Sequence, residues 1–214
     1  ASVTIPHKLE VMDYIDEVDE IAKKVGAVNI LSNNGGKIIG SNSDCYGAIE
    51  ALKEKTSLKN KNVLVIGAGG GARAIIYGLK NENVVITLTN RTLDKAKSLA
   101  DEFNINYGKI ENMKDLIKNS DIIINTTSVG MNPRPDESII KEEYLVEGKI
   151  VMDIVYKPIE TKMIKMARKA KCTAITGDRM LAYQALKPFK MWTGHDAGFS
   201  MMENALLEQI RKGE

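Results

Sequence analysis

A glycine-rich segment in the middle of the chain has the residue types and spacing that can bind a phosphate group. It follows an aliphatic run at 63–66 and has the form G-x-G-x-x-A, made by Gly67, Ala68, Gly69, Gly70, Gly71 and Ala72. Glycines allow a positive φ and a close backbone approach, and the free N–H groups at a helix start attract negative charge. Because glycine turns before helices also occur as plain connections, the pattern alone is a weak indication of a nucleotide site.

Polar residues after the next expected strand indicate which dinucleotide would bind. Dinucleotide folds usually place an acid about 20 residues past the glycines to hold the adenosine ribose. This chain instead has Asn90, Arg91 and Thr92, with Lys95 one helical turn later. No carboxylate there repels a 2′-phosphate, and the planar guanidinium of Arg91 can grip one, so NADP is favoured over NAD. In the plain alternative, Thr92 only caps a helix and Arg91 is a surface charge.

These residues need a scaffold in which strands and helices alternate. Hydrophobic patterns predict strands at 63–66, 84–89, 121–125, 150–154 and 173–176, and helices at 72–79, 93–103, 113–118 and 159–169. Right-handed crossovers join such strands into a parallel sheet covered by helices. The loop with Thr127 and Ser128 follows one strand at the sheet edge where ligands bind, although it could be an ordinary polar loop.

The regions on either side of this alternation differ from it. Before it, strands are expected at 2–5, 27–31 and 37–39, and helices at 6–16, 18–24 and 44–55. Gly26 is expected to end the second helix, and Ser43 or Asp44 to cap the third. After Gly177, two amphipathic helices at 179–191 and 199–212 have no strand between them, so we expect them to leave the sheet.

Composition argues against several classes of protein. The 214 residues are 43% hydrophobic and 27% charged, as in ordinary globular proteins, and 30 basic against 28 acidic residues give a net charge of +2. Nucleic acid and membrane surfaces are therefore not expected partners. With only Cys45 and Cys172, neither a disulfide scaffold nor a metal site is expected, and a reducing cytoplasm is the natural location.

Several further short motifs occur along the chain besides the glycine segment and 90–92. They are Thr4-Ile5-Pro6-His7-Lys8, Gly26-Ala27-Val28-Asn29, Asn42-Ser43-Asp44, 125–131, Asp153 to Pro158 and Gly177 to Gln184. Together, in one unbroken order across nearly all of the chain, these motifs resemble the shikimate dehydrogenase family. The resemblance implies an α/β fold with a Rossmann-type parallel-sheet cofactor domain and a smaller α/β substrate domain. It also implies NADP-dependent, reversible reduction of 3-dehydroshikimate to shikimate.

The resemblance assigns roles to individual residues. Lys8 stands where the family has its catalytic general acid and base, and Asp44 where it has the partner carboxylate. Taken alone, a lysine in this position is usually solvated and an aspartate is more often a helix cap. The family's substrate-binding positions correspond to Thr4, Asn29, Asp44, Tyr156 and Gln184, and its nicotinamide pocket to Ile154 and Gly177.

The resemblance also suggests domain boundaries. We expect a first part of the substrate domain at 1–44, a connecting helix at 45–58, the NADP-binding domain at 59–178, and helices returning to the substrate domain at 179–214. Family members carry an additional N-terminal segment with a Ser-x-Ser element for the substrate carboxylate, which this sequence lacks. The expectation is an N-terminally shortened substrate domain with an exposed sheet edge and apolar surface, which a homodimer could cover.

One motif departs slightly from the family pattern. Ser43 replaces the usual threonine beside Asp44, a change that keeps the hydroxyl group.

Two alternatives remain open at this stage. One alternative is a dehydrogenase that also accepts quinate. The other is a truncated, non-catalytic module that binds NADP only.

Overall fold

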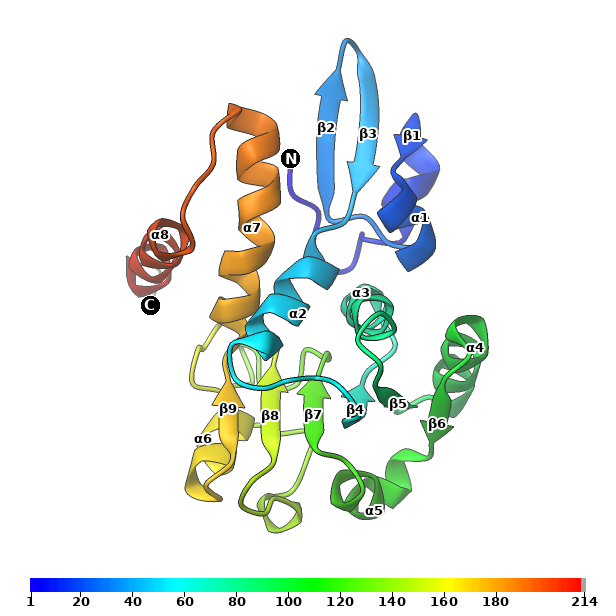
Figure 1. The fold of residues 1–214 in the computed structure, drawn as a ribbon, viewed down its shortest axis with the longest axis vertical. Helices are drawn as coiled ribbons and strands as arrows, with labels where there is room; N and C mark the ends of the chain where they lie inside the picture. The colour runs from blue at the N-terminus through cyan, green and yellow to red at the C-terminus, as the bar shows by residue number, and fades with distance from the viewer. Residues whose placement is uncertain (213–214) are drawn as a thin grey trace.

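A six-stranded parallel sheet forms the larger half of the molecule. The computed structural model describes residues 1–212, and its large sheet has the order β6-β5-β4-β7-β8-β9 (Figure 1). The strands are β4 Asn62–Ile66, β5 Val85–Thr89, β6 Asn106–Gly108, β7 Ile122–Asn125, β8 Ile150–Asp153 and β9 Thr173–Ile175. The order reverses between β4 and β7, which is the position where doubly wound sheets bind ligands. The predicted parallel Rossmann-type sheet is confirmed, and the short, polar β6 is an addition to it.

Helices cover both faces of this sheet. They are α3 Gly70–Leu79, α4 Leu93–Phe103, α5 Met113–Lys118 and α6 Lys162–Lys169, with short 3-10 helices η2 Ile110–Asn112 and η3 Glu142–Tyr144. One buried cluster joins α3 and α4 to the sheet, and a second joins α5 and α6 to its other face. The expected helix 159–169 begins later, because Thr161 caps it by accepting from the Ile164 N–H at 3.3 Å.

A small three-stranded sheet lies beyond the cofactor-type sheet. Its order is β1 Glu17–Val18, β3 Lys37–Ser41 and β2 Ile30–Asn34, with β2 and β3 forming the predicted antiparallel hairpin. Helix α1 Glu20–Val25 ends at Gly26, whose φ of 69° is the left-handed conformation expected of a C-terminal glycine. Residues 27–29 precede β2 instead of belonging to it.

The first sixteen residues differ from the sequence expectation. The expected strand 2–5 is reduced to a single bridge between Ser2 and Ile30, and the expected helix 6–16 is a 3-10 helix η1 at Glu10–Tyr14. An α-helix would require the Lys8 carbonyl to accept from Met12. That carbonyl instead accepts from the Val28 N–H at 2.8 Å, so a bond to a neighbouring segment replaces helix formation.

Two helices lie between the two sheets, and the two helices predicted after Gly177 are both present. Helix α2 Asp44–Lys53 and helix α7 Gly177–Thr193 lie side by side between the large sheet and the hairpin, and α8 Phe199–Lys212 packs on α7 (Figure 1). Arg179 of α7 holds this corner together, because its guanidinium bonds the carboxylates of Glu54 and Glu203.

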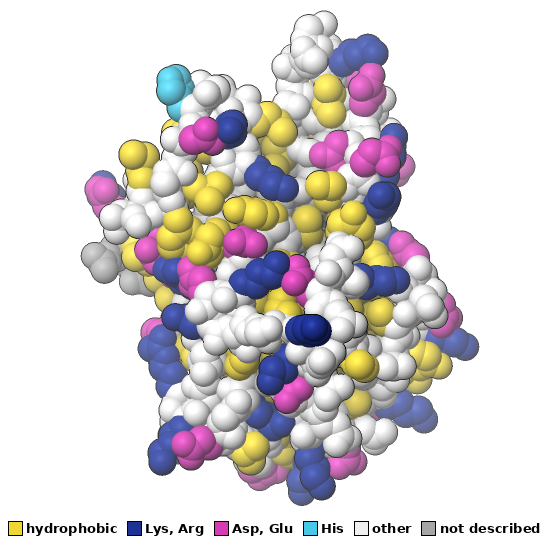
Figure 2. Space-filling view, in the orientation of Figure 1, with side chains coloured by type: hydrophobic (Ala, Val, Ile, Leu, Met, Phe, Trp, Pro, Cys, Tyr) yellow, Lys and Arg dark blue, Asp and Glu magenta, His cyan; other side chains and the backbone are white. Residues whose placement is uncertain are grey.

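The face between α7 and the hairpin gathers hydrophobic side chains (Figure 2). Exposed apolar residues at the start of the chain include Ile5 and Leu9, at 60% and 44% exposure. Strand β2 pairs on one side with β3, and on its other side the described residues add only the Ser2 bridge. Across residues 1–212, none of the helices combines the length and apolar character needed to traverse a bilayer.

Candidate active site

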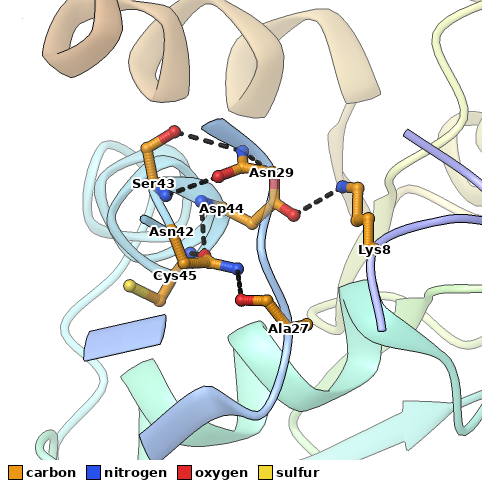
Figure 3. Close-up of polar contacts among 7 residues, drawn as sticks. All are labelled: Lys8, Ala27, Asn29, Asn42, Ser43, Asp44 and Cys45. Carbon is orange, nitrogen blue, oxygen red and sulfur yellow. Dashed lines mark hydrogen bonds and ion pairs between the residues drawn. The ribbon is translucent and has the colours of Figure 1, made fainter. Parts of the chain in front are cut away.

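Lys8 and Asp44 form a close ion pair between the two sheets. The Lys8 Nζ lies 2.5 Å from Asp44 Oδ2, and the two side chains are 15% and 1% exposed (Figure 3). The turn 5–9 carries the lysine, and the first residue of α2 carries the aspartate. A nearly buried ammonium held by a buried carboxylate can donate a proton to a ligand that binds next to it and take it back.

A network of amides holds Asp44 in place (Figure 3). Asn29 Nδ2 donates to Asp44 Oδ1 at 2.9 Å, and Asn29 Oδ1 accepts from the Ser43 N–H at 2.9 Å. Both carboxylate oxygens of Asp44 therefore have partners, one neutral and one cationic. The structure brings three predicted site residues together in this network, namely Lys8, Asn29 and Asp44.

The capping of α2 differs from the expectation. Ser43 occupies the N-cap position, but its side chain makes no capping bond. Asn42 caps the helix instead: its Oδ1 accepts from the Asp44 N–H at 2.9 Å, while its Nδ2 donates to the Ala27 carbonyl. Asparagine side chains often accept from the backbone N–H two residues later. Asn42 could therefore have been predicted from the sequence as the residue that caps α2.

The glycine turn between β4 and α3 has the geometry of an anion cradle. Gly67 has a φ of 115°, which requires glycine, and Gly69 at the N-cap faces open space where a Cβ would project. No side chain caps α3 and its first turn has no acid, so its free N–H groups remain available. A diphosphate fits these features.

The glycine turn lies directly against Lys8. A Cβ on Gly70 would be 3.1 Å from Lys8 Cβ and 3.4 Å from Lys8 Cδ. The predicted cofactor turn and the predicted catalytic lysine, more than 60 positions apart in sequence, therefore share one contact.

Residues after β5 lie beside this turn. β5 pairs with β4, and the Gly67 N–H donates to the Thr89 carbonyl at 2.8 Å. Asn90 Nδ2 bonds the Thr92 carbonyl, whereas Arg91, Thr92 and Lys95 are exposed. Thr92 stands at the N-cap of α4, but its side chain makes no capping bond. The alternative in which Thr92 serves only to cap this helix therefore loses its main support.

A buried carboxylate links the ends of β7 and β8. Asp153 Oδ1 accepts from Asn125 Nδ2 at 2.9 Å and from the Val155 N–H at 3.1 Å, and its Oδ2 accepts from Thr161 Oγ1 at 2.7 Å. Burial raises the pKa of Asp153 from 3.8 to about 6, and the hydrogen bonds only partly oppose this effect. Neither Asn125 nor Asp153 was among the predicted site residues, since polar groups at strand ends are common in sequence.

The raised pKa of Asp153 makes stability depend on pH. The folded state holds the proton up to about pH 6 and the unfolded chain only to about pH 4, so this group's contribution to the unfolding free energy falls as pH rises between those values. The loss is on the order of 2–3 kcal/mol. The unfolding free energy, measured with urea at pH 4 and at pH 7, should fall by this additional amount in the wild type compared with Asp153→Asn. Parallel pH profiles of the two proteins would contradict the assignment.

Ile154, Gly71 and Gly177 meet beside the same turn. A Cβ on Gly71 would lie 3.1 Å from Ile154 Cδ1, and one on Gly177 would lie 2.6 Å from the Ile154 carbonyl oxygen. Thr127 joins them from β7: its Cγ2 lies 3.0 Å from the corresponding position on Gly67, and its hydroxyl donates to Asn125. Two predicted cofactor residues, Thr127 and Ile154, thus pack against the glycine turn, Gly177 packs against Ile154, and Ser128 is exposed next to Thr127.

The remaining predicted substrate residues are less closely tied to the ion pair. Gln184 of α7 packs against α2, because its Cβ lies 2.8 Å from where a Cβ on Gly47 would stand. Thr4 is exposed and precedes Lys8 on the same turn, and Tyr156 is 37% exposed in the loop after β8. Within the described part of the chain, the side chains of Thr4 and Tyr156 make no hydrogen bond to Lys8 or Asp44.

Comparison with known proteins gives one consistent result. The family described as Shikimate / quinate 5-dehydrogenase matches residues 50–167, and the shikimate dehydrogenase substrate binding domain matches residues 1–31. A shikimate dehydrogenase (NADP(+)) of Methanocaldococcus jannaschii is 43% identical over 220 residues, which cover 99% of this chain and 78% of that protein.

Solved structures agree with the sequence relatives. A shikimate dehydrogenase crystallised in complex with NADP+ superimposes with a TM-score of 0.90 at 41% identity, covering 98% of this chain and 76% of the other. The Thermus thermophilus shikimate 5-dehydrogenase in complex with NADP(H) and shikimate gives a TM-score of 0.87 at 32% identity, covering 97% and 77%. On the strength of these matches and of the shared fold, the chain belongs to the shikimate dehydrogenase family.

Proposed function

We infer that this protein catalyses the NADP-dependent, reversible reduction of 3-dehydroshikimate to shikimate. The observation that carries this inference is the Lys8–Asp44 pair, 2.5 Å apart and in contact with the glycine turn through Gly70. Relatives of about 40% identity over nearly the whole chain are NADP-dependent shikimate dehydrogenases, which supports the same reaction.

The chain's own residues account for the proton in this reaction. NADPH, if held by the residues around the glycine turn, would supply the hydride that the carbonyl carbon of the substrate needs. The carbonyl oxygen then needs a proton, which the Lys8 ammonium donates during reduction and recovers during oxidation. Asp44 keeps Lys8 oriented and compensates its charge, while Asn29 fixes the second oxygen of Asp44.

The cofactor site is proposed from the fit of the residues around the glycine turn. The N–H groups at Gly69, Gly70 and Gly71 would hold the diphosphate, together with the backbone at Gly67 and Ala68. Asn90, Arg91, Thr92 and Lys95 would hold the adenosine end. Thr127, Ser128, Ile154 and Gly177 would line the nicotinamide end.

Substrate residues are proposed to converge on the same ion pair. Asn29 and Asp44 lie within hydrogen-bonding distance of each other, and Gln184 approaches from α7. Thr4 and Tyr156 lie on the flanking turn and loop, where a bound substrate would draw their hydroxyl groups inward.

Turnover is the direct test of this proposal. Purified protein should reduce NADP when shikimate is added, with a signal at the nicotinamide absorbance band that requires both compounds. Absence of turnover with either shikimate or 3-dehydroshikimate would overturn the proposed function.

The cofactor preference rests on Arg91. Replacement by alanine should raise the KM for NADP about 10- to 150-fold, because a charged hydrogen bond to a phosphate contributes roughly 1.5–3 kcal/mol. The KM for NAD should stay nearly unchanged, since NAD lacks the 2′-phosphate. Arg134→Ala is a suitable control, because Arg134 is exposed and its guanidinium pairs with Glu137, three positions away. An equal rise for both cofactors would contradict a 2′-phosphate contact.

Quinate is a second candidate substrate. The matching family description names both shikimate and quinate. Assays of quinate with NAD and with NADP decide the point, and a kcat/KM for quinate comparable to that for shikimate would favour a dual-substrate enzyme.

A non-catalytic NADP-binding module is the alternative from a different class. Separate titrations of NADPH and shikimate distinguish it from an enzyme. Tight NADPH binding without detectable shikimate binding would favour the module, whereas binding of both supports the enzyme.

Location and assembly complete the proposal. We propose a cytoplasmic enzyme, because Cys45 and Cys172 are both free and buried. We also propose a homodimer that covers apolar surface near Ile5 and the part of the β2 edge beyond the Ser2 bridge. Light scattering after size-exclusion chromatography measures the mass, and a monomer at all tested concentrations would contradict the dimer.

A further inference from the structure

The hydrogen-bond network around Asp153 connects two loops that reach the glycine turn. Asp153 accepts from Asn125, from the Val155 N–H and from Thr161. These partners belong to the end of β7, the loop after β8 and the cap of α6. A single buried carboxylate therefore joins three separate segments.

The first loop reaches one end of the glycine turn. Asn125 Oδ1 accepts from both the N–H and the hydroxyl of Thr127, at 3.0 and 2.7 Å. Thr127 Cγ2 in turn lies 3.0 Å from the position of a Cβ on Gly67. The orientation of Asn125, which Asp153 sets, thus determines where Thr127 stands.

The second loop reaches the other end of the turn. Ile154 lies between Asp153 and Val155, both of which take part in the network, and its own N–H donates to the Asn125 carbonyl at 3.1 Å. Its Cδ1 lies 3.1 Å from a Cβ position on Gly71, the residue next to the Gly70 contact with Lys8. Ile154 and Lys8 therefore flank adjacent residues of one turn.

We propose that Asp153 is a positioning residue for the nicotinamide end of the cofactor. By fixing Thr127 and Ile154 on either side of the glycine turn, it sets the distance and angle between the hydride-carrying ring and the substrate carbon beside Lys8. This inference rests on the proposed function, and it adds a residue that touches neither cofactor nor substrate. Misplacement of reacting groups by about 1 Å can reduce the rate a hundredfold, so positioning of this kind has a measurable effect.

The isosteric variant separates geometry from charge. In Asp153→Asn, the remaining oxygen can still accept from Asn125 and Val155, and the new amide can donate to Thr161 Oγ1. In Asp153→Ala, all three bonds are lost. We expect kcat to fall about tenfold or more in the alanine variant, with the KM for shikimate within about twofold, and to recover largely in the asparagine variant.

A readout other than activity is the fluorescence of bound NADPH. The Kd for NADPH should change by less than about threefold in Asp153→Ala, because the glycine turn and Arg91 are untouched. The emission of the bound reduced nicotinamide should move toward that of free NADPH, since the ring is no longer held. If the wild type fails to turn over shikimate, the proposed function fails, whereas this emission comparison still tests the role of Asp153.

Asp121→Ala is the matched control. Asp121 Oδ2 accepts from the Asn62 N–H at 2.8 Å, so this carboxylate also bridges two strands, at the opposite end of β7. Its removal should lower the thermal midpoint while kcat and bound-NADPH emission remain as in the wild type.

Three results would overturn the proposal. They are wild-type kcat and emission in folded Asp153→Ala, an equal loss of kcat in Asp121→Ala, and failure of asparagine to restore activity. If Asp153→Ala does not fold, Thr161→Val takes its place, since it removes one bond to Asp153 together with the side-chain cap of α6. We expect about threefold lower kcat with unchanged NADPH affinity for that variant, and unchanged kcat and emission would overturn the proposal.

Discussion

Replacing Lys8 with methionine should lower kcat by about 10²–10⁴-fold, because the reaction loses its proton donor while the fold is kept. Methionine retains most of the aliphatic stem that lies 3.1 Å from the Cβ position of Gly70. The KM for NADP should change little, since the lysine amine faces Asp44 and not the glycine turn. Steady-state kinetics in both directions measure the effect.

Lys24→Met provides the control for this prediction. Lys24 is an exposed lysine on α1, remote from the ion pair, so its replacement should leave kcat within about twofold. Unchanged activity in Lys8→Met would show that Lys8 is not the proton donor, whatever the control shows.

Replacing Gly177 with alanine should both destabilise the protein and disturb the cofactor site. The added methyl group would overlap the carbonyl oxygens of Ile154 and Val155, which are backbone atoms that cannot rotate away. Overpacking of this kind costs about 1–3 kcal/mol, which for a chain of this size lowers the thermal midpoint by roughly 3–10 °C. Because Ile154 must move, kcat should fall as well.

The control for this substitution is Gly198→Ala. Gly198 has nothing within 4 Å of its Cβ position and does not adopt a positive φ. Its alanine variant should unfold at the wild-type temperature. A Gly177→Ala protein that is as stable and as active as this control would show that α7 can shift away from β8 without cost.

The cofactor half of the fold was largely predictable from sequence because its signals are local. Aliphatic runs such as 63–66, followed by glycines and a helical repeat, define strand, turn and helix within a short window. Strand β6 was missed, since Asn106, Tyr107 and Gly108 carry no hydrophobic run. The hydrogen bonds to β5 hold these residues in a strand, although their side chains do not favour one.

The N-terminal part was less predictable because its structure depends on distant contacts. The helical spacing after Pro6 was overridden by one bond between the Val28 N–H and the Lys8 carbonyl. Strand β1 consists of only Glu17 and Val18, which pair with β3 some twenty positions later. Local propensity carries no information about either contact.

The site itself was predictable only in part. Physical reasoning from sequence reached the glycine turn and Arg91, whereas Lys8 and Asp44 entered through the family resemblance, because no spacing rule links residues 36 positions apart. Asp153 and Asn125 lacked any distinguishing signal until the ends of β7 and β8 were seen to lie together.

The contact between Gly70 and the Lys8 stem restricts how this enzyme can evolve. Any side chain at position 70 would meet Lys8 Cβ at 3.1 Å and Leu9 Cδ1 at 3.3 Å, so these neighbours would have to shift by a few tenths of an ångström. A lineage that adapts its turn to another nucleotide can therefore vary Arg91 without touching Lys8, whereas a larger residue at position 70 would press on the stem that carries the proton donor. Near Arg91, residues that select the nucleotide can therefore change without affecting the proton donor, but not at Gly70, where both functions share one contact.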